Sequence, residues 1–160
     1  MDQRIYVLDA VNPEIPMVGK LRPAEEKDMS FLPFWAESFY ASAGKPSEVS
    51  ADGEKYRYHI QDGRLYILEV DGAAVSMARI NREMVNMAGV AFVYTPPYFR
   101  GRGYASAAVA GISQMWLDKG FTGCVLYTDL ANPTSNSIYQ KIGYKPVCDS
   151  LDIKFTEEEV

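Results

Sequence analysis

The segment Tyr98–Ala105 constrains the fold of this chain most, because it places two glycines and two arginines where an apolar run gives way to an amphipathic segment. The apolar run is Gly89–Tyr94, and the alanine-rich amphipathic stretch begins at Gly103. This order predicts a strand, a tight turn and a helix. The free N–H groups of such a turn and the positive end of the helix dipole form a site for an anion, most often a phosphate.

The residue types in the turn fit an anion site. The glycines let a ligand approach the backbone closely, and Arg100 and Arg102 place two positive charges beside it. The turn is neither the G-x-G-x-x-G dinucleotide fingerprint nor a P-loop, because no Gly-Lys-Ser/Thr follows. Taken alone, it is equally compatible with a tight turn that carries solvated arginines. Its interpretation therefore depends on the second half of the chain.

Composition narrows the function classes. The 160 residues suffice for one domain with a real core, and 48% apolar with 23% charged residues is typical of a globular protein. The net charge of −5 argues against a nucleic-acid binder, whose affinity depends on neutralising phosphates. An acidic balance mildly favours a cationic or amine substrate.

The sequence carries no pattern for a membrane span, a signal peptide or a metal site. No apolar run approaches the roughly 18 residues of a membrane span, and the N-terminus lacks a signal-peptide pattern. Cys124 and Cys148 form no metal-ligand spacing with the single histidine, His59. We therefore expect no metal and no membrane, and a reducing, cytoplasmic setting.

The first half of the chain predicts a leader and two helices. Residues 1–16 read as a leader or interdomain linker that contains a short strand at residues 5–8, and the main domain is expected over residues 17–160. A strand through residue 21 precedes a helix that begins at Pro23 and is kinked or divided at Pro33. A second helix is expected over Pro46–Gln61.

The second half predicts a meander and a crossover. From residue 65 the apolar period changes to two, and Asp71-Gly72 is a strong hairpin signal. The expected elements are strands at 65–70, 73–80 and 88–94, a helix at 103–118, a strand at 121–128 parallel to the one before the helix, a short helix from Asn132-Pro133 to Gly143, and one or two strands at 144–155. This order belongs to the α/β class with a mixed sheet.

With these elements and two motifs, the chain resembles the GNAT family of acyl-CoA-dependent N-acyltransferases over residues 19–149. The family pattern Gln/Arg-x-x-Gly-x-Gly/Ala reads here as Arg100 to Ala105. A second family block, Asn, six residues, Tyr and then Gly-Phe/Tyr, reads as Asn132, Tyr139 and Gly143-Tyr144. The wording of residues 126–139 is similar to the C-terminal halves of predicted two-domain bacterial members.

The resemblance implies a fold and a setting. The fold is a mixed, mostly antiparallel sheet of six to seven strands with helices on both faces, in which two parallel strands splay at the cofactor site. Residues 1–16 would then link this domain to an N-terminal partner domain, and a homodimer is the other expected assembly.

The resemblance also implies an activity, the transfer of an acetyl group from acetyl-CoA to a primary amine of a small molecule or peptide. The pantetheine arm would pair with strand backbone between residues 91–94 and 125–128, and backbone amides would polarise the thioester carbonyl. The cofactor-binding residues implied are Phe92, Val93, Tyr94, Arg100, Gly101, Arg102, Gly103, Tyr104, Ala105, Asn132 and Tyr139.

Tyr139 matches the family's tyrosine and is expected to protonate the departing thiolate; the alternative is a core tyrosine. For Asn132, the alternative to cofactor binding is a plain N-cap. The base is left open, because the strand before the turn has no acid, unlike that of many members. The candidates are Glu37, Glu83, Asp129 and a bound water, whereas His59 is expected to be structural. The expected lining of the acceptor pocket is Trp35, Phe39, Tyr40 and Tyr58.

Two other functions stay open at this stage. A non-catalytic module that binds acetyl-CoA would fit the missing strand acid. A structural domain that has lost the cofactor fits less well, because the glycines and arginines of the turn are intact. The identity of the acceptor is not predicted.

Overall fold

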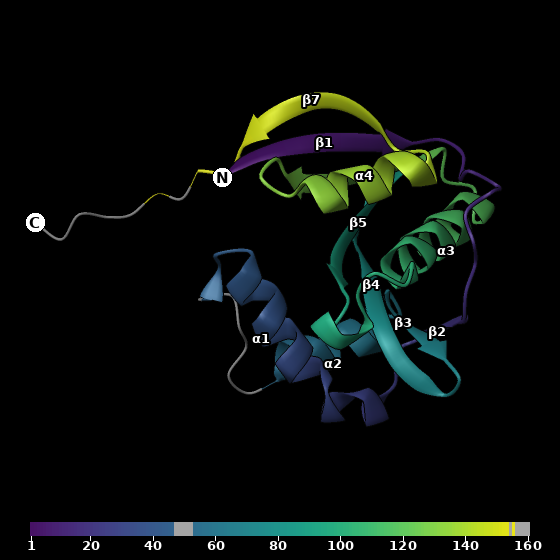
Figure 1. The fold of residues 1–160 in the computed structure, drawn as a ribbon, viewed down its shortest axis with the longest axis vertical. Coiled ribbons are helices and arrows are strands. Elements are labelled where there is room, and N and C mark those ends of the chain that lie inside the picture. Colours follow the sequence, from purple (N-terminus) through teal and green to yellow (C-terminus); the bar gives the residue numbers. More distant parts are fainter. Residues whose placement is uncertain (47–52, 154, 156–160) are drawn as a thin grey trace, which may run out of the picture.

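An open sheet of seven strands organises the computed structural model, which describes residues 1–46, 53–153 and 155 (Figure 1). Only β5 and β6 are parallel; every other neighbouring pair is antiparallel, which confirms the mixed, mostly antiparallel sheet. The spatial order is β2-β3-β4-β5-β6-β1-β7. The strands are β1 Asp2–Leu8, β2 Lys20–Pro23, β3 Leu65–Val70, β4 Ala73–Glu83, β5 Met87–Tyr94, β6 Gly123–Asp129 and β7 Lys145–Leu151.

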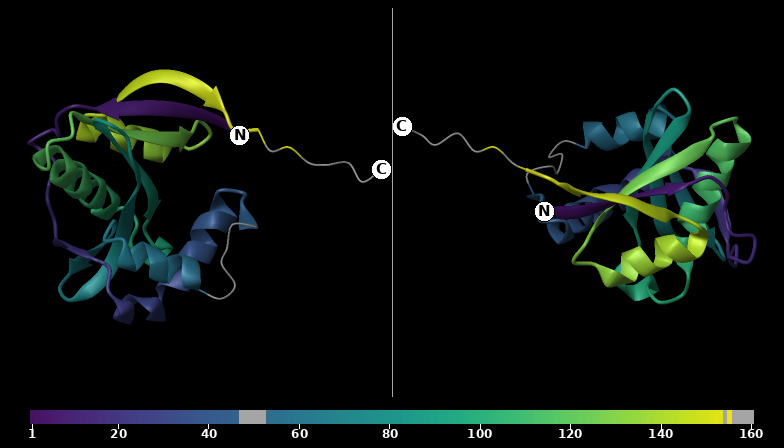
Figure 2. Two further views of the ribbon diagram at one scale, coloured as in Figure 1. Left: turned by 180° about the vertical axis from the view of Figure 1, so that it is seen from behind. Right: turned by 90° about the horizontal axis from the view of Figure 1, so that it is seen from above.

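Helices cover both faces of the sheet, as expected (Figure 2). On one side α3 packs against β3, β4 and β5, with α4 beside it; on the other, α1 packs against β5 and shares a second core cluster with α2. None of the helices in the described ranges is long and apolar enough to span a membrane. The helices are α1 Leu32–Ser42, α2 Glu54–Gln61, α3 Tyr104–Asp118 and α4 Pro133–Ile142, with 3-10 turns η1 Glu26–Ser30 and η3 Pro97–Phe99.

The first helical region is divided at Pro33, as the sequence predicts. The turn η1 comes first, and α1 then begins with the proline in its first turn, where the missing N–H costs no hydrogen bond. Helix α2 starts after Gly53, which has a positive φ of 74°. The part of the second expected helix that covers residues 47–52 lies outside the described residues.

The β3–β4 hairpin is confirmed at Asp71-Gly72. Both residues have positive φ, 51° and 79°, as a two-residue hairpin turn requires. Strand β4 runs on to Glu83 rather than ending at residue 80, because Arg82 and Glu83 still pair with β5. The polar side chains of Arg82 and Glu83 lie on the exposed end of the strand.

Strand β1 changes the expected domain boundary. Residues 2–8 lie between β6 and β7 and pair antiparallel with both. Tyr6 and Leu8 are fully buried, so this strand belongs to the same sheet and core as the rest of the domain. A boundary at Met17 therefore cuts through one sheet. Residues 9–16 connect β1 to β2 of this same sheet, and Val11 and Ile15 pack against its core. That an N-terminal partner domain precedes the chain stays a prediction.

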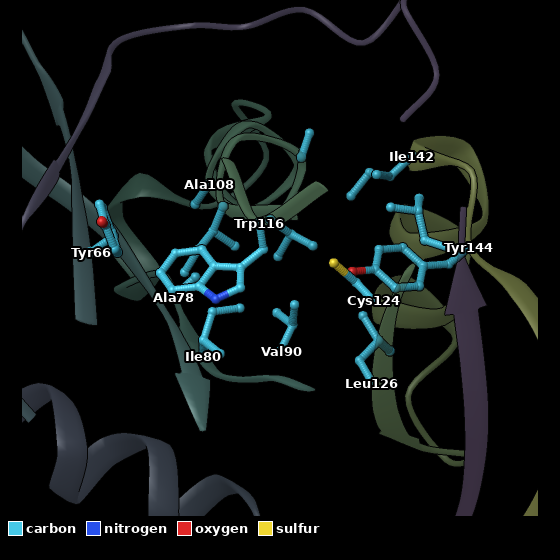
Figure 3. Packing of buried hydrophobic residues seen from close by; sticks show 14 of the residues in the cluster. Tyr66, Ala78, Ile80, Val90, Ala108, Trp116, Cys124, Leu126, Ile142 and Tyr144 are labelled. Atoms are coloured by element: carbon cyan, nitrogen blue, oxygen red, sulfur yellow. The ribbon is translucent and has the colours of Figure 1, made fainter. Parts of the chain in front are cut away.

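Trp116 on α3 lies at the centre of the larger core (Figure 3). Its indole N–H donates to Glu83 over 3.0 Å, and its ring meets Tyr66 edge to face at 5.8 Å. Burial extends around most of α3, because its small residues let the sheet approach closely. Cys124 is also core, and burial raises the pKa of its thiol to about 11.

Candidate functional site

The parallel strands diverge soon after they meet. The β5–β6 pairing covers three residue pairs, from Met87 with Gly123 to Gly89 with Val125. Further along, Arg79 pairs with Ala91 and Met77 with Tyr94, so β5 carries one extra residue against β4. This is a β-bulge, and its Phe92 has a φ of 56°, which is rare for a bulky side chain. The splay expected beyond residue 90 is therefore present.

The turn before α3 has the geometry of an anion site. Gly101 and Gly103 have φ values of 76° and 79°, and open space surrounds the position of a Cβ at each. The first helical hydrogen bond runs from Ala107 N to Gly103 O over 3.1 Å, so the N–H groups of residues 104–106 have no acceptor inside the helix. No side chain caps this end of the helix.

The two arginines of the turn have different positions. Arg100 Nε donates to the Thr95 carbonyl over 2.9 Å, and its guanidinium lies 5.9 Å from the centre of the Tyr94 ring. Arg102 stacks instead over the exposed Tyr98 ring at 5.3 Å. Only Arg100 lines the cavity described below.

A cavity of about 1080 Å³ joins the turn, the bulge, α4 and the ends of α1 and α2. A smaller hollow of about 330 Å³ reaches between the splayed strands and shares Phe92, Val93 and Tyr139 with it. Every sequence-predicted cofactor residue except Arg102 lines the larger cavity: Phe92, Val93, Tyr94, Arg100, Gly101, Gly103, Tyr104, Ala105, Asn132 and Tyr139.

Tyr139 lines this cavity from α4 and is held in an apolar setting. Burial raises its pKa to about 12, and its ring meets Tyr144 edge to face at 6.2 Å. Its hydroxyl makes no hydrogen bond within the part of the chain that the structure describes. The side chain is therefore protonated at neutral pH and is not the satisfied core tyrosine that the sequence left as the alternative.

Asn132 is the N-cap of α4, since its Oδ1 accepts from Ser135 N over 3.1 Å. Sequence reasoning missed its neighbour Asn136. The Oδ1 of Asn136 accepts from the hydroxyls of Tyr6 (2.8 Å) and Thr128 (2.7 Å), and its Nδ2 donates to the carbonyls of Asp129 and Asn132. Asn136 thus ties β1, β6 and α4 together beside the cavity. No sequence pattern identifies partners that arrive from separate elements.

Of the three carboxylates expected as candidates for the general base, only one lines the cavity. Asp129 lines the cavity, and its Oδ1 accepts from Ala131 N. Glu83 accepts from Trp116 and pairs with Arg64, and neither Glu83 nor Glu37 lines the cavity. No group of three or more His, Cys, Asp or Glu residues in the described ranges could hold a metal ion.

His59, expected to be structural, also lines the cavity. Its Nδ1 is buried without a hydrogen-bond partner, and its ring lies 6.1 Å from that of Phe92. Burial, and then the nearby positive charge of Arg79, lower its pKa to about 4, so the imidazole is neutral at pH 7. Of the four aromatic residues expected around the acceptor, Phe39 and Tyr40 line the cavity, whereas Trp35 and Tyr58 do not.

The sequence matches the model of the acetyltransferase (GNAT) family over residues 30–144. This match covers more than half of the chain, which therefore belongs to the GNAT family. A search of curated proteins found no match.

Solved structures share the fold. A GNAT-family acetyltransferase from Novosphingobium aromaticivorans is 21% identical with a TM-score of 0.66, and covers 93% of this chain. An N-acetyltransferase from Sphaerobacter thermophilus is 16% identical with a TM-score of 0.71, and covers 92%. This chain spans 62% and 49% of those two chains. An aminoglycoside N-acetyltransferase in complex with CoA is 19% identical (TM-score 0.61), with 88% of this chain and 95% of that chain covered.

Proposed function

We propose that this protein transfers an acetyl group from acetyl-CoA to a primary amine in the 1080 Å³ cavity. The observation that carries the proposal is the meeting of three features in this one cavity. They are the helix N-terminus with its glycine turn, the bulged strand that splays from β6, and the protonated Tyr139. Membership of the GNAT family supports acyl transfer as the reaction class.

The turn and α3 would bind the pyrophosphate. The N–H groups of residues 104–106 and the positive end of α3 favour a multiply charged anion. Arg100 adds a positive charge that its hydrogen bond to Thr95 holds in place. We expect the pantetheine arm to run along the bulged end of β5, where the neighbouring strand has moved away, and Asn132 Nδ2 to donate to one of its carbonyls.

The bulge would activate the thioester. An amide freed by a bulge can donate to the carbonyl oxygen as negative charge develops there, and one such donor contributes about 10²–10³-fold to the rate. The amine must attack in its neutral form. For a lysine-like pKa of about 10.4 this costs about 4–5 kcal/mol at pH 7, which positioning in the cavity offsets. The base is Asp129, a bound water or His59, and we assign none of them.

Tyr139 would protonate the departing thiolate. A tyrosine with a pKa of about 12 holds its proton until the thiolate forms. Transfer to an ordinary thiolate, whose conjugate acid has a pKa of about 8.5, is uphill in water. The apolar surroundings that raise the tyrosine pKa also destabilise the thiolate, which narrows this difference.

A transfer assay tests the proposal. Incubation with acetyl-CoA and a panel of primary amines should release CoA thiol only when an amine is present, with the acetylated amine detected by mass spectrometry. Tight CoA binding without transfer to any amine would contradict the enzyme and favour a non-catalytic binding module. Light scattering on the same sample would distinguish a monomer from a homodimer, both of which are compatible with a chain that spans about half of several relatives.

A further inference from the structure

The end of the cavity away from the phosphate turn is lined by cations. Lys45, Lys55 and Arg79 reach it from the end of α1, from α2 and from β4. The acid partners Asp152 of Lys45 and Asp62 of Arg79 do not line the cavity. Among the described residues, the one carboxylate in the lining is Asp129, at the end of β6 near α4.

Two polar atoms at this end have no partner among the described residues. They are Arg79 Nε and His59 Nδ1, and both are buried. The other guanidinium nitrogens of Arg79 are used, by Asp62 and by the Ile80 carbonyl. A guanidinium N–H can only donate, and a neutral imidazole can donate through one nitrogen, so an acceptor oxygen suits both.

Aromatic rings form the apolar wall beside these groups. Phe92 lies 5.0 Å from Phe39 and 5.8 Å from Tyr40, measured between ring centres. The Lys55 Nζ lies 4.9 Å from the centre of the Tyr40 ring, at the edge of this wall. The same Phe92 forms the bulge where the thioester would lie, so the wall connects the reacting end with the cations.

We propose that the acceptor is an amine that also carries a negatively charged group, with its nitrogen at the bulge of Phe92 and its anion directed toward Lys55 and Arg79. This inference rests on the proposed acetyl transfer and names its substrate class. Composition favoured a cationic substrate, because the net charge is −5. The proposal reverses this expectation, because the bound amine is affected most by the charges that line the acceptor end. An acceptor that carries several positive charges would be repelled here.

Matched amine pairs test the proposal. L-Phenylalanine and 2-phenylethylamine differ by one carboxylate, and O-phosphoethanolamine and ethanolamine differ by one phosphate. We expect kcat/KM to be at least about tenfold higher for the anionic member of at least one pair, and the responding pair identifies the anion. The proposal is overturned if 2-phenylethylamine and ethanolamine, which lack the anionic group, each have a kcat/KM equal to or higher than that of the anionic member of the pair.

Variants of Lys55 test whether this side chain causes the preference for the anionic amine. Lys55→Met should raise KM for the anionic amine by about tenfold and leave its uncharged counterpart within twofold, whereas Lys55→Arg should restore most of the preference. Lys20→Met is the matched control, because Lys20 is exposed on β2 and does not line the cavity. A preference that survives in Lys55→Met while the protein stays folded overturns the assignment of Lys55.

His59 gives a readout that does not depend on activity, because it is the only histidine of the chain. With CoA present, its NMR titration should shift to a higher pKa on addition of the anionic amine, since a nearby anion favours the imidazolium. The uncharged counterpart should leave it unchanged. If an amine is acetylated but no anionic amine moves the His59 signal, this inference fails and the proposed function stands; if CoA does not bind or no amine is acetylated, the proposed function fails.

Discussion

Two side chains in the cavity have pKa values that burial moves in opposite directions. The pKa of Tyr139 is raised to about 12, and the pKa of His59 is lowered to about 4. Both groups are therefore neutral across the physiological range, one as a proton donor and the other as an acceptor or donor of a hydrogen bond. The cavity thus holds neutral polar groups near the bulge and fixed charges at its two ends.

Replacement of Tyr139 by Phe should lower kcat about 10²-fold and leave the Kd of acetyl-CoA within about threefold. A general acid contributes about 10²–10⁴-fold, and the hydroxyl has no hydrogen bond within the described residues whose loss would disturb the fold. Steady-state kinetics and calorimetry separate the two quantities. Tyr98→Phe, at an exposed ring, is the control. An unchanged kcat in Tyr139→Phe would remove the tyrosine from the mechanism.

His59 should make the fold sensitive to mild acid. Its pKa is below the unfolded value of about 6.5, so the stability that it contributes is complete above pH 6.5 and is lost as the pH falls toward 4. Because the ring is only partly buried, we expect a loss on the order of 1 kcal/mol. Urea unfolding at pH 7 and pH 4.5 measures it. His59→Gln should flatten this dependence; an equal loss in the variant would contradict the assignment.

At the scale of elements, Asn136 holds α4 against the sheet. Its amide makes four hydrogen bonds, to groups on β1, β6 and the start of α4. Tyr139 lies one turn further along the same helix. The position of the catalytic candidate therefore depends on a residue that does not line the cavity.

Asn136→Ala should destabilise the protein by about 2–3 kcal/mol, because it leaves partly buried hydroxyl and carbonyl groups without partners. It should also weaken acetyl-CoA binding, since α4 would lose its fixed position beside β6. Ser137→Ala, on the exposed face of the same helix, is the matched control. Chemical denaturation measures both variants. Equal stability of the two would show that the network does not hold α4.

The elements that sequence reasoning identified carry their signals locally. The Asp71-Gly72 turn, the Pro33 break and the Asn132 cap each follow from a few adjacent residues, and the structure confirms all three. The bulge at Phe92 could not be predicted, because its strained φ is imposed by pairing with β4. Of the acceptor end, the expected Phe39 and Tyr40 line the cavity. Its charged groups were missed, since His59 and Arg79 meet only after α2 packs against the sheet.

At the scale of the whole molecule, β1 brings the two ends of the chain together, because this first strand pairs with β7, the last strand. It lies between β6 and β7, and its buried Tyr6 and Leu8 complete the core beneath α4. Sequence reasoning expected a short strand at residues 5–8 but read residues 1–16 as a leader or linker, because the resemblance to the family begins only at residue 19.

Removal of residues 1–8 should prevent stable folding. It would leave the edge of β6 unpaired, detach β7 from the sheet and expose the core below Tyr6. Circular dichroism and the thermal unfolding transition test this, with removal of residues 156–160 as the control deletion. A shortened chain with an unchanged transition would show that β1 is dispensable and would support a domain that begins near Met17.

The central claim is that the turn before α3 holds the pyrophosphate of acetyl-CoA, and calorimetric titration with acetyl-CoA tests it most directly. Gly103→Glu places a carboxylate in the open space at the helix N-terminus, whereas Gly120→Glu makes the same change at another positive-φ glycine with open space, beyond the far end of α3. We predict micromolar binding by the wild type and by Gly120→Glu and at least about 100-fold weaker binding by Gly103→Glu. Equal affinities of the two variants, or no binding by a folded wild type, would contradict the claim.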